Sequence, residues 1–289
     1  MTYIDRSDEE RELAAEDQRR ERASRNGQAP DDAEKALPGG IFLFGSEYED
    51  GPALWGDGPN VLWSPGESLM VAAPQGLGKT TLGGQLVRAL LGLDDSVFGL
   101  PVTPTDKRIL YLAMDRPRQI RRSLRRQFTE SDAELLNRRL VVRPGPPDAD
   151  LAAHPLLLRG MAEHYDAGIV FVDSLKDAAL GLSSDETGSA WNRARQHLLA
   201  SDREMCEFHH CRKPSGGDQK RKLTIDDIYG SAWLTNGCGS VILLAGEPGD
   251  PIIDFRHVKQ PWDEVGPFTL QVDHDAGRML STARSTCSH

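Results

Sequence analysis

The sequence predicts an α/β fold in which a mostly parallel central sheet is covered by helices. Three observations support this prediction. Short apolar runs alternate with segments of helical periodicity between residues 68 and 246, a pattern typical of parallel sheets. The first apolar run enters a glycine-bearing loop that leads directly into an amphipathic helix. Two β-rich runs then flank a turn, which predicts a C-terminal β-hairpin over residues 250–276.

The periodicity assigns the elements in order. Apolar runs bounded by polar or turn residues predict the strands, and apolar positions spaced three and four apart predict the helices. The expected strands lie near residues 68–74, 108–114, 140–143, 168–173, 205–210 and 240–246. The expected helices lie near residues 79–91, 117–128, 152–164 and 188–200.

Composition divides the chain into three parts. Residues 1–40 are rich in Glu, Asp and Arg, so we expect a disordered arm or a frayed helix. Residues 41–67 contain aromatic residues and Gly/Pro turns, which predicts a lead-in that packs on the core or on a neighbouring subunit. Residues 68–289 should form the main domain, and the 38% hydrophobic content of the chain is enough to bury a soluble core.

Charge and apolar patterning exclude several classes of protein. No stretch approaches the length of a membrane span, and the N-terminus is charged where a secretory signal would be apolar, so we expect a cytoplasmic location and no membrane association. Four cysteines are too few and too unevenly spaced for a disulfide framework. The net charge of −10 argues against a surface that coats nucleic acid everywhere, although a local basic channel remains compatible with it.

A predicted phosphate-binding loop follows the first strand, in the sequence SLMVAAPQGLGKTTLGGQLVRALL. Gly76 and Gly78 let backbone N–H groups curl around a polyphosphate, and the next helix directs its positive end at the anion. We expect Lys79 to reach the β- and γ-phosphates of ATP and Thr80 to hold Mg²⁺. Ala73 stands where the usual pattern begins with glycine. The predicted nucleotide-binding residues are Ala73, Pro74, Gln75, Gly76, Leu77, Gly78, Lys79, Thr80 and Thr81.

Two other predicted strands lead to carboxylates. The strand in GIVFVDSLKD ends at Asp173, which is suited to hold the water shell of Mg²⁺ opposite Thr80. Ser174 follows it in place of a second acidic residue, so the base must come from elsewhere. Asp115 follows the strand in RILYLAMD, at the edge where ligand sites of open parallel sheets gather, and is our candidate to orient the attacking water. The alternative is that Asp115 only caps the helix beginning near Pro117.

The strand over residues 205–210 leads into a basic, glycine-containing loop. His209 and His210 are candidates to sense the γ-phosphate, with a structural role as the alternative for one of them. Neighbouring strand residues point to opposite faces, so we do not expect these histidines to share a zinc site with Cys206 and Cys211. The loop suits a phosphate backbone, and a solvated surface loop is the alternative. The candidate nucleic-acid contacts are Arg212, Lys213, Lys220, Arg221 and Lys222.

The predicted helix near residues 117–128 is strongly basic. We expect a solvated face or contacts between subunits, because this helix should cover a sheet face away from the loops. DNA contact is the less favoured alternative. Its arginines are Arg118, Arg121, Arg122, Arg125 and Arg126.

Taken together, residues 60–280 resemble the RecA/DnaB superfamily, and more narrowly the RepA-like hexameric replicative helicase ATPases of plasmids, phages and integrated elements. The resemblance is carried by APQGLGKTT, YLAMD, FVDSL, HHCRK and YGSAWLTNGCGSVILL. It implies a RecA-like P-loop core, ATP and Mg²⁺ bound between adjacent subunits of a hexameric ring, and action on single-stranded DNA in replication. It also implies a primase or a loading protein as a further partner.

The resemblance gives roles to matching positions. Lys79 and Thr80 match the phosphate and Mg²⁺ positions, Asp173 matches the second Mg²⁺ position, and Asp115 matches a carboxylate that is usually Glu.

HVKQPWDEVGPF resembles the finger segment of the family. It makes Lys259, together with Arg256, the candidate for a basic group supplied to the neighbouring subunit. Pro261 stands where a second basic residue is expected. The DNA-contacting loops that face the channel correspond to segments around 181–190 and 213–226.

Three functions compete at this point. The leading one is an ATP-driven motor on single-stranded DNA. The alternative is a RecA-like regulatory ATPase that switches on a protein partner without translocating, and it stays open because of Asp115 and the absent second finger residue. A small-molecule phosphoryl transferase would need a lid of arginines and an acceptor pocket, and the predicted hairpin fits a ring interface better than a lid.

Overall fold

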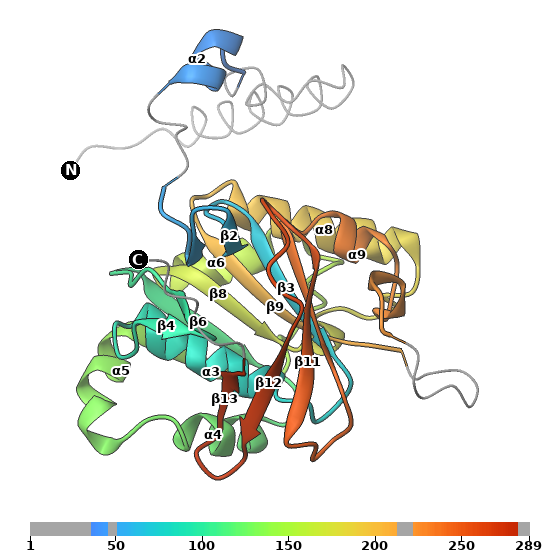
Figure 1. Cartoon of the computed structure of the whole chain (residues 1–289). Coiled ribbons are helices and arrows are strands. Elements are labelled where there is room, and N and C mark those ends of the chain that lie inside the picture. Colours follow the sequence, from blue (N-terminus) through green and yellow to red (C-terminus); the bar gives the residue numbers. More distant parts are fainter. Residues whose placement is uncertain (1–35, 46–50, 213–221, 283–289) are drawn as a thin grey trace, which may run out of the picture. The chain divides into compact units, whose positions relative to one another are not determined.

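A computed structural model describes residues 36–45, 51–212 and 222–282 (Figure 1). The chain divides into two compact units, Met1–Glu49 and Asp50–His289. In the described part of the first unit, helix α2 (Gly39–Phe44) exposes apolar side chains. Most of the predicted charged arm lies outside the described residues. The second unit contains the sheet and the residues of the candidate site.

A nine-stranded sheet forms the centre of the second unit among the described residues, in the order β13-β12-β11-β10-β3-β9-β8-β6-β7. The strands from β10 to β7 pair in parallel, which confirms the predicted α/β fold with a mostly parallel sheet. They are β10 (Ser240–Ala245), β3 (Ser68–Ala73), β9 (Glu204–His210), β8 (Ala167–Asp173), β6 (Arg108–Ala113) and β7 (Leu140–Pro144).

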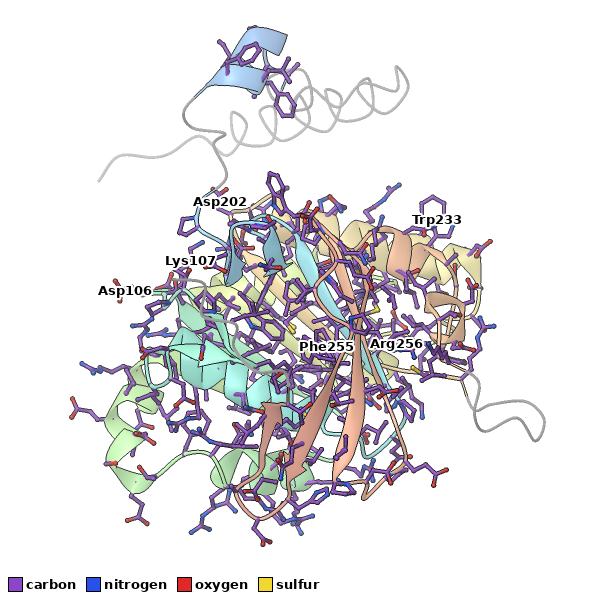
Figure 2. The ribbon with its side chains drawn as sticks, viewed as in Figure 1. Asp106, Lys107, Asp202, Trp233, Phe255 and Arg256 are labelled. Atoms are coloured by element: carbon purple, nitrogen blue, oxygen red, sulfur yellow. The ribbon has the colours of Figure 1, made fainter. Side chains whose placement is uncertain are left out.

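The C-terminal strands extend this sheet with antiparallel pairing. β11 (Ile252–Lys259) pairs with β10, and β12 (Phe268–Asp273) and β13 (Arg278–Ser281) follow. The predicted hairpin therefore continues into a third strand and covers what would be a free sheet edge. Side chains along β11 point alternately into and out of the core. Phe255 points inwards, is fully buried and stacks on Phe268 with ring centroids 4.3 Å apart. The adjacent Arg256 is only partly buried (Figure 2).

Helices cover both faces of the sheet (Figure 1). Because strand side chains alternate, Leu69 and Val71 join one core cluster with α3 and α4, whereas Met70 and Ala72 join the other with α6 and α8. The helices are α3 (Lys79–Leu90), α4 (Pro117–Arg125), α5 (Ala133–Arg139), α6 (Leu157–His164), α7 (Leu175–Ala178), α8 (Asp185–Leu199) and α9 (Trp233–Asn236). No helix in the described ranges is long and apolar enough to cross a membrane.

The segment around 181–190, predicted as a channel loop, is only partly a loop. Helix α8 begins at Asp185, because the Ser184 hydroxyl accepts a hydrogen bond from Thr187 N at 3.1 Å and caps the first turn. The loop prediction is therefore wrong for the second half of that segment.

The described part of the lead-in packs on the core of the same chain. β1 (Trp55–Asp57) and β2 (Asn60–Trp63) form an antiparallel hairpin. Trp55 and Trp63 are fully buried, and their indole N–H groups donate to Val97 O and Glu67 O. The short pair β4 (Ser96–Val97) and β5 (Leu100–Pro101) lies against β1.

A fully buried ion pair joins α8 to β9. Arg195 Nε and Nη2 lie 2.7 and 2.8 Å from the two carboxylate oxygens of Glu207, and both side chains are 0% exposed. Arg195 Nη2 also donates to Leu234 O at 2.9 Å. The pair matters for stability because removing one partner leaves a buried charge without compensation.

Replacing Glu207 by Gln should lower the free energy of unfolding by about 3–5 kcal/mol, measured by urea denaturation. Glu163→Gln is the matched control, since Glu163 pairs with Arg159 on the exposed surface of α6 and should leave the midpoint unchanged. Equal effects of the two substitutions would show that the buried ion pair contributes no more to the free energy of unfolding than the exposed one.

Burial also makes the fold sensitive to acid. The His257 ring accepts or donates a hydrogen bond at 2.8 Å with Ser240 Oγ, and burial lowers its pKa to about 4. The unfolded chain binds this proton first, near pH 6.5, so the contribution of His257 is complete above pH 6.5 and is lost as the pH falls towards 4. We expect the urea midpoint to fall between pH 6.5 and pH 5, and to fall less in His257→Gln. A parallel decline in both proteins would contradict this assignment.

Candidate functional site

The loop between β3 and α3 has the backbone that the glycines predict. Gly76 and Gly78 have φ values of 87° and 83°, a region that side chains with a Cβ rarely adopt. The loop is also closely packed, since a Cβ at Gly78 would lie 3.1 Å from Met279 Sδ and one at Gly76 would lie 3.3 Å from Pro248 Cβ. The conformation therefore favours glycine at both positions, and a larger side chain would also sit tightly against a neighbour.

Lys79 lies inside the curl of this loop. Its side chain is largely buried, and Nζ donates to Ala73 O at 3.0 Å and to Pro74 O at 3.1 Å. Burial lowers the pKa of Lys79 to about 8, although nearby Asp173 acts in the opposite direction. The ammonium group can exchange these carbonyl partners for phosphate oxygens.

Asp173 is positioned by two hydroxyl groups. Thr80 Oγ1 donates to Asp173 Oδ2 at 2.9 Å, and the Tyr111 hydroxyl donates to the same oxygen at 2.7 Å. Burial and then Asp173 raise the pKa of Tyr111, so its hydroxyl keeps the proton that it donates. Burial raises the pKa of Asp173 itself, against the effect of these hydrogen bonds. A carboxylate and a hydroxyl at this spacing are the hard oxygen donors that Mg²⁺ requires, so the residues fit the cation.

A cavity of about 390 Å³ opens beside the loop. It brings together residues from the ends of β6, β8 and β9, from α4 and from the turn between β12 and β13. The predicted residues that line it are Gln75, Gly76, Lys79, Thr80, Thr81, Asp115, Asp173 and His210. The lining residues that the sequence analysis did not assign to the site are Arg116, Gln119, Ile120, Arg122, Ser123, Arg126, Ser174 and His274.

Asp115 faces this cavity. Its carboxylate pairs with Arg116, at 3.3 Å between Oδ1 and Nε. Helix α4 receives no side-chain hydrogen bond at its N-terminus among the described residues, so Asp115 does not act there as a cap. The backbone fixes its position, because Met114 N donates to Asp173 O at 2.7 Å.

His209 and His210 lie in different environments. His210 lines the cavity, and burial, followed by nearby Lys79, lowers its pKa to about 4. His209 is fully buried, with Nε2 2.6 Å from Tyr229 O, and burial lowers its pKa to about 3. Only His210 borders the cavity, because neighbouring strand residues point to opposite faces.

The finger candidates lie on β11. Lys259 Nζ donates to the carbonyls of Thr235 and Asn236, at 3.2 and 2.7 Å, and Arg256 Nη1 donates to Leu223 O at 3.3 Å. The described residues that line the cavity of the same chain include neither of them.

The candidate nucleic-acid loop is described only at its ends. Arg212 Nη2 donates to Gly230 O at 2.9 Å, and Lys222 is exposed. Lys213, Lys220 and Arg221 lie outside the described residues.

Helix α4 turns two basic faces in different directions. Arg122 and Arg126 border the cavity, and Arg126 Nη1 donates to His274 O at 2.9 Å. Arg118, Arg121 and Arg125 line a separate, mainly apolar groove formed with α5 and β7. The expectation that this helix lies away from the loops is wrong for Arg122 and Arg126, because α4 packs against α3, the helix that follows the phosphate loop.

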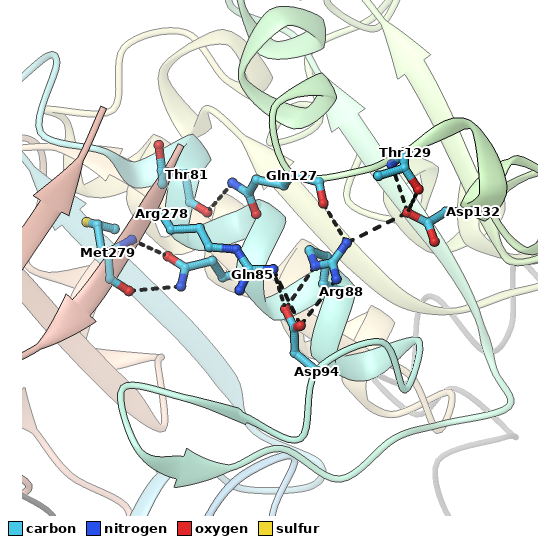
Figure 3. Close-up of polar contacts among 9 residues, drawn as sticks. All are labelled: Thr81, Gln85, Arg88, Asp94, Gln127, Thr129, Asp132, Arg278 and Met279. Atoms are coloured by element: carbon cyan, nitrogen blue, oxygen red, sulfur yellow. Dashed lines mark hydrogen bonds and ion pairs between the residues drawn. The ribbon is translucent and has the colours of Figure 1, made fainter. Parts of the chain in front are cut away.

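A polar network joins the C-terminal strand to the helix after the loop (Figure 3). Gln85 donates to Met279 O and accepts from Met279 N, both at 2.9 Å. Asp94 accepts from Arg88 at 2.8 Å and from Arg278 at 3.2 Å. The sequence offered no local signal for this network, since its partners are far apart in the chain.

Three features together define a P-loop nucleotide-binding site. The loop has glycines at positive φ, it surrounds a buried lysine, and a Thr–Asp pair lies beside it at the carboxyl edge of a parallel sheet. The family model described as AAA domain matches residues 55–215, which is more than half of the chain. The chain therefore belongs to the AAA domain family and is a P-loop ATPase. This family binds nucleotide, usually with Mg²⁺. No curated protein matches the chain.

Gly78→Ala should weaken nucleotide binding by about tenfold or more, because the positive φ and the contact with Met279 strain the loop by roughly 1–3 kcal/mol. The affinity for a fluorescent ATP analogue measures this effect. Gly160→Ala is the matched control, since this glycine lies in helix α6 with open space around its Cβ position. Unchanged affinity in Gly78→Ala would contradict the role of the loop.

Proposed function

We propose that this ATPase is a RecA-type motor, similar to RepA-like and DnaB helicases, that hydrolyses ATP and acts on single-stranded DNA in replication. The observation that carries the proposal is one cavity that combines Lys79, the Thr80–Asp173 pair, Asp115 and His210. Its position at the carboxyl edge of a RecA-like sheet supports the same conclusion.

The geometry suggests how hydrolysis proceeds. Lys79 exchanges its two carbonyl partners for phosphate oxygens and neutralises charge on the transferred group. Asp115 accepts a proton from a water whose oxygen forms a bond to the γ-phosphorus, while the bond from that phosphorus to the bridging oxygen breaks and ADP leaves. Thr80 and Asp173 would hold Mg²⁺, which would supply further charge neutralisation.

Backbone contacts between His210 and the residues flanking the basic loop support the motor function. His210 is followed directly by Cys211 and Arg212, where the basic loop begins. The far end of the loop returns to the same strand, because Tyr229 N donates to His210 O at 3.0 Å and Cys211 forms a β-bridge with Ile228. His210 is therefore connected to the residues that flank the loop on both sides, which is the route we propose for a signal from the γ-phosphate.

The position of Lys259 and Arg256 is compatible with the finger assignment. Lys259 and Arg256 lie outside the cavity of their own chain, as residues supplied to a neighbouring subunit would. We propose a homo-oligomeric ring, a hexamer as in the similar helicases, in which Lys259 approaches the ATP of the next subunit. A primase or a loading protein is the further partner expected on this basis.

Steady-state ATP hydrolysis with and without single-stranded DNA tests the motor. We expect DNA to stimulate hydrolysis in the wild type, Lys79→Ala to abolish hydrolysis, and neutralisation of Lys220, Arg221 and Lys222 to weaken the stimulation, because phosphate contacts provide the affinity for DNA.

The control removes the same charge elsewhere, by neutralising three exposed arginines on separate helices, Arg138, Arg159 and Arg193. It should leave the stimulation unchanged. Hydrolysis that ignores DNA would contradict the motor and favour a regulatory ATPase that switches on a protein partner.

A further inference from the structure

Arg116 connects β6 to α4 in an unfavourable backbone conformation. Its φ and ψ are 49° and 65°, the left-handed region in which the Cβ of a non-glycine residue meets the backbone. Strain of this kind is kept where the surrounding structure uses it, and it concentrates at functional sites. Arg116 lies at such a site, since it lines the cavity beside the phosphate loop.

Its guanidinium group lies against the proposed base. Nε is 3.3 Å from Asp115 Oδ1, and Nη2 is 3.4 Å from Asp115 Oδ2. The side chains of Arg116 and Asp115 are 52% and 36% exposed, so this ion pair is weak and easily exchanged. A triphosphate in the same cavity carries more negative charge than one carboxylate and would attract the guanidinium away from it.

We propose that Arg116 is a catalytic residue for ATP hydrolysis that acts on the nucleotide of its own subunit. Its N–H groups donate to γ-phosphate oxygens as the water–phosphorus bond forms and the phosphorus–bridging-oxygen bond breaks. The guanidinium stays protonated throughout, and the Asp115 carboxylate that it releases takes the water proton. This inference rests on the hydrolysis proposed above.

The neighbouring arginines are placed less well for this role. Arg118 and Arg121 line the apolar groove on the other side of α4. Arg122 lies six residues further on, about 9 Å along the helix axis, and Arg126 is already bound to His274 O. A guanidinium within the same chain also supplies the charge that the finger segment lacks at Pro261.

Arg116→Ala should lower kcat about 100-fold while changing the affinity for a non-hydrolysable ATP analogue by less than about threefold. It should also abolish trapping of ADP with aluminium fluoride, which mimics the transferred phosphoryl group. Arg118→Ala is the matched control on the same helix and should retain both properties. Loss of affinity equal to the loss of kcat, or an unchanged kcat, would overturn the proposal.

Arg116→Gly separates catalysis from folding. Glycine adopts positive φ freely, so this variant should unfold at or above the wild-type temperature and still lose hydrolysis. Recovery of wild-type kcat in Arg116→Gly would show that Arg116 matters only for the backbone.

Mixing variants tests whether Arg116 acts within its own subunit. In rings assembled from Arg116→Ala and Lys79→Ala chains, no site has both residues in the same chain, so we expect no recovery of hydrolysis. Recovery would show that Arg116 serves the neighbour and would overturn the proposal. If the proposed function itself is wrong, the result is different. Either the wild-type protein does not hydrolyse ATP, or hydrolysis persists in Lys79→Ala.

Discussion

One carboxylate oxygen of Asp173 accepts hydrogen bonds from Thr80 and Tyr111, and the rest of the site depends on this arrangement. A buried carboxylate is costly unless hydrogen bonds compensate it, so the first turn of α3, the strand β6 and the end of β8 must hold fixed positions around it. The backbone strengthens the constraint, because Met114 N and Asp115 N both bond to Asp173 O. The proposed base is thereby held at the edge of the cavity by the residue that would hold Mg²⁺.

The C-terminal strands contribute to this site from a distance. Met279 on β13 bonds to Gln85 through its backbone, and its sulfur lies 3.1 Å from where a Cβ at Gly78 would be. Pro248, in the turn between β10 and β11, lies close to Gly76. These residues lie beyond the matched family region of 55–215, yet they leave little space beside the phosphate loop. The antiparallel extension of the sheet therefore packs against the phosphate loop and α3 as well as covering an edge.

Helix α4 shows how an acidic chain presents basic chemistry locally. Its arginines fall on two faces, so one set borders the phosphate cavity and the other borders the apolar groove. A left-handed turn at Arg116 connects β6 to this helix within three residues. The charge beside the phosphate loop thus depends on which face of α4 carries the arginines. It does not follow from the overall charge of −10.

Local sequence determined the strand–loop–helix at residues 68–91, the alternation of strands and helices, and the position of Asp173, because each follows from periodicity or turn chemistry within a short window. Tertiary structure alone decided the third C-terminal strand, the hydrogen bond of Tyr111 to Asp173, the division between His209 and His210, and the face of α4 that meets the cavity. These depend on how elements distant in sequence pack together, and a local pattern carries no information about that packing.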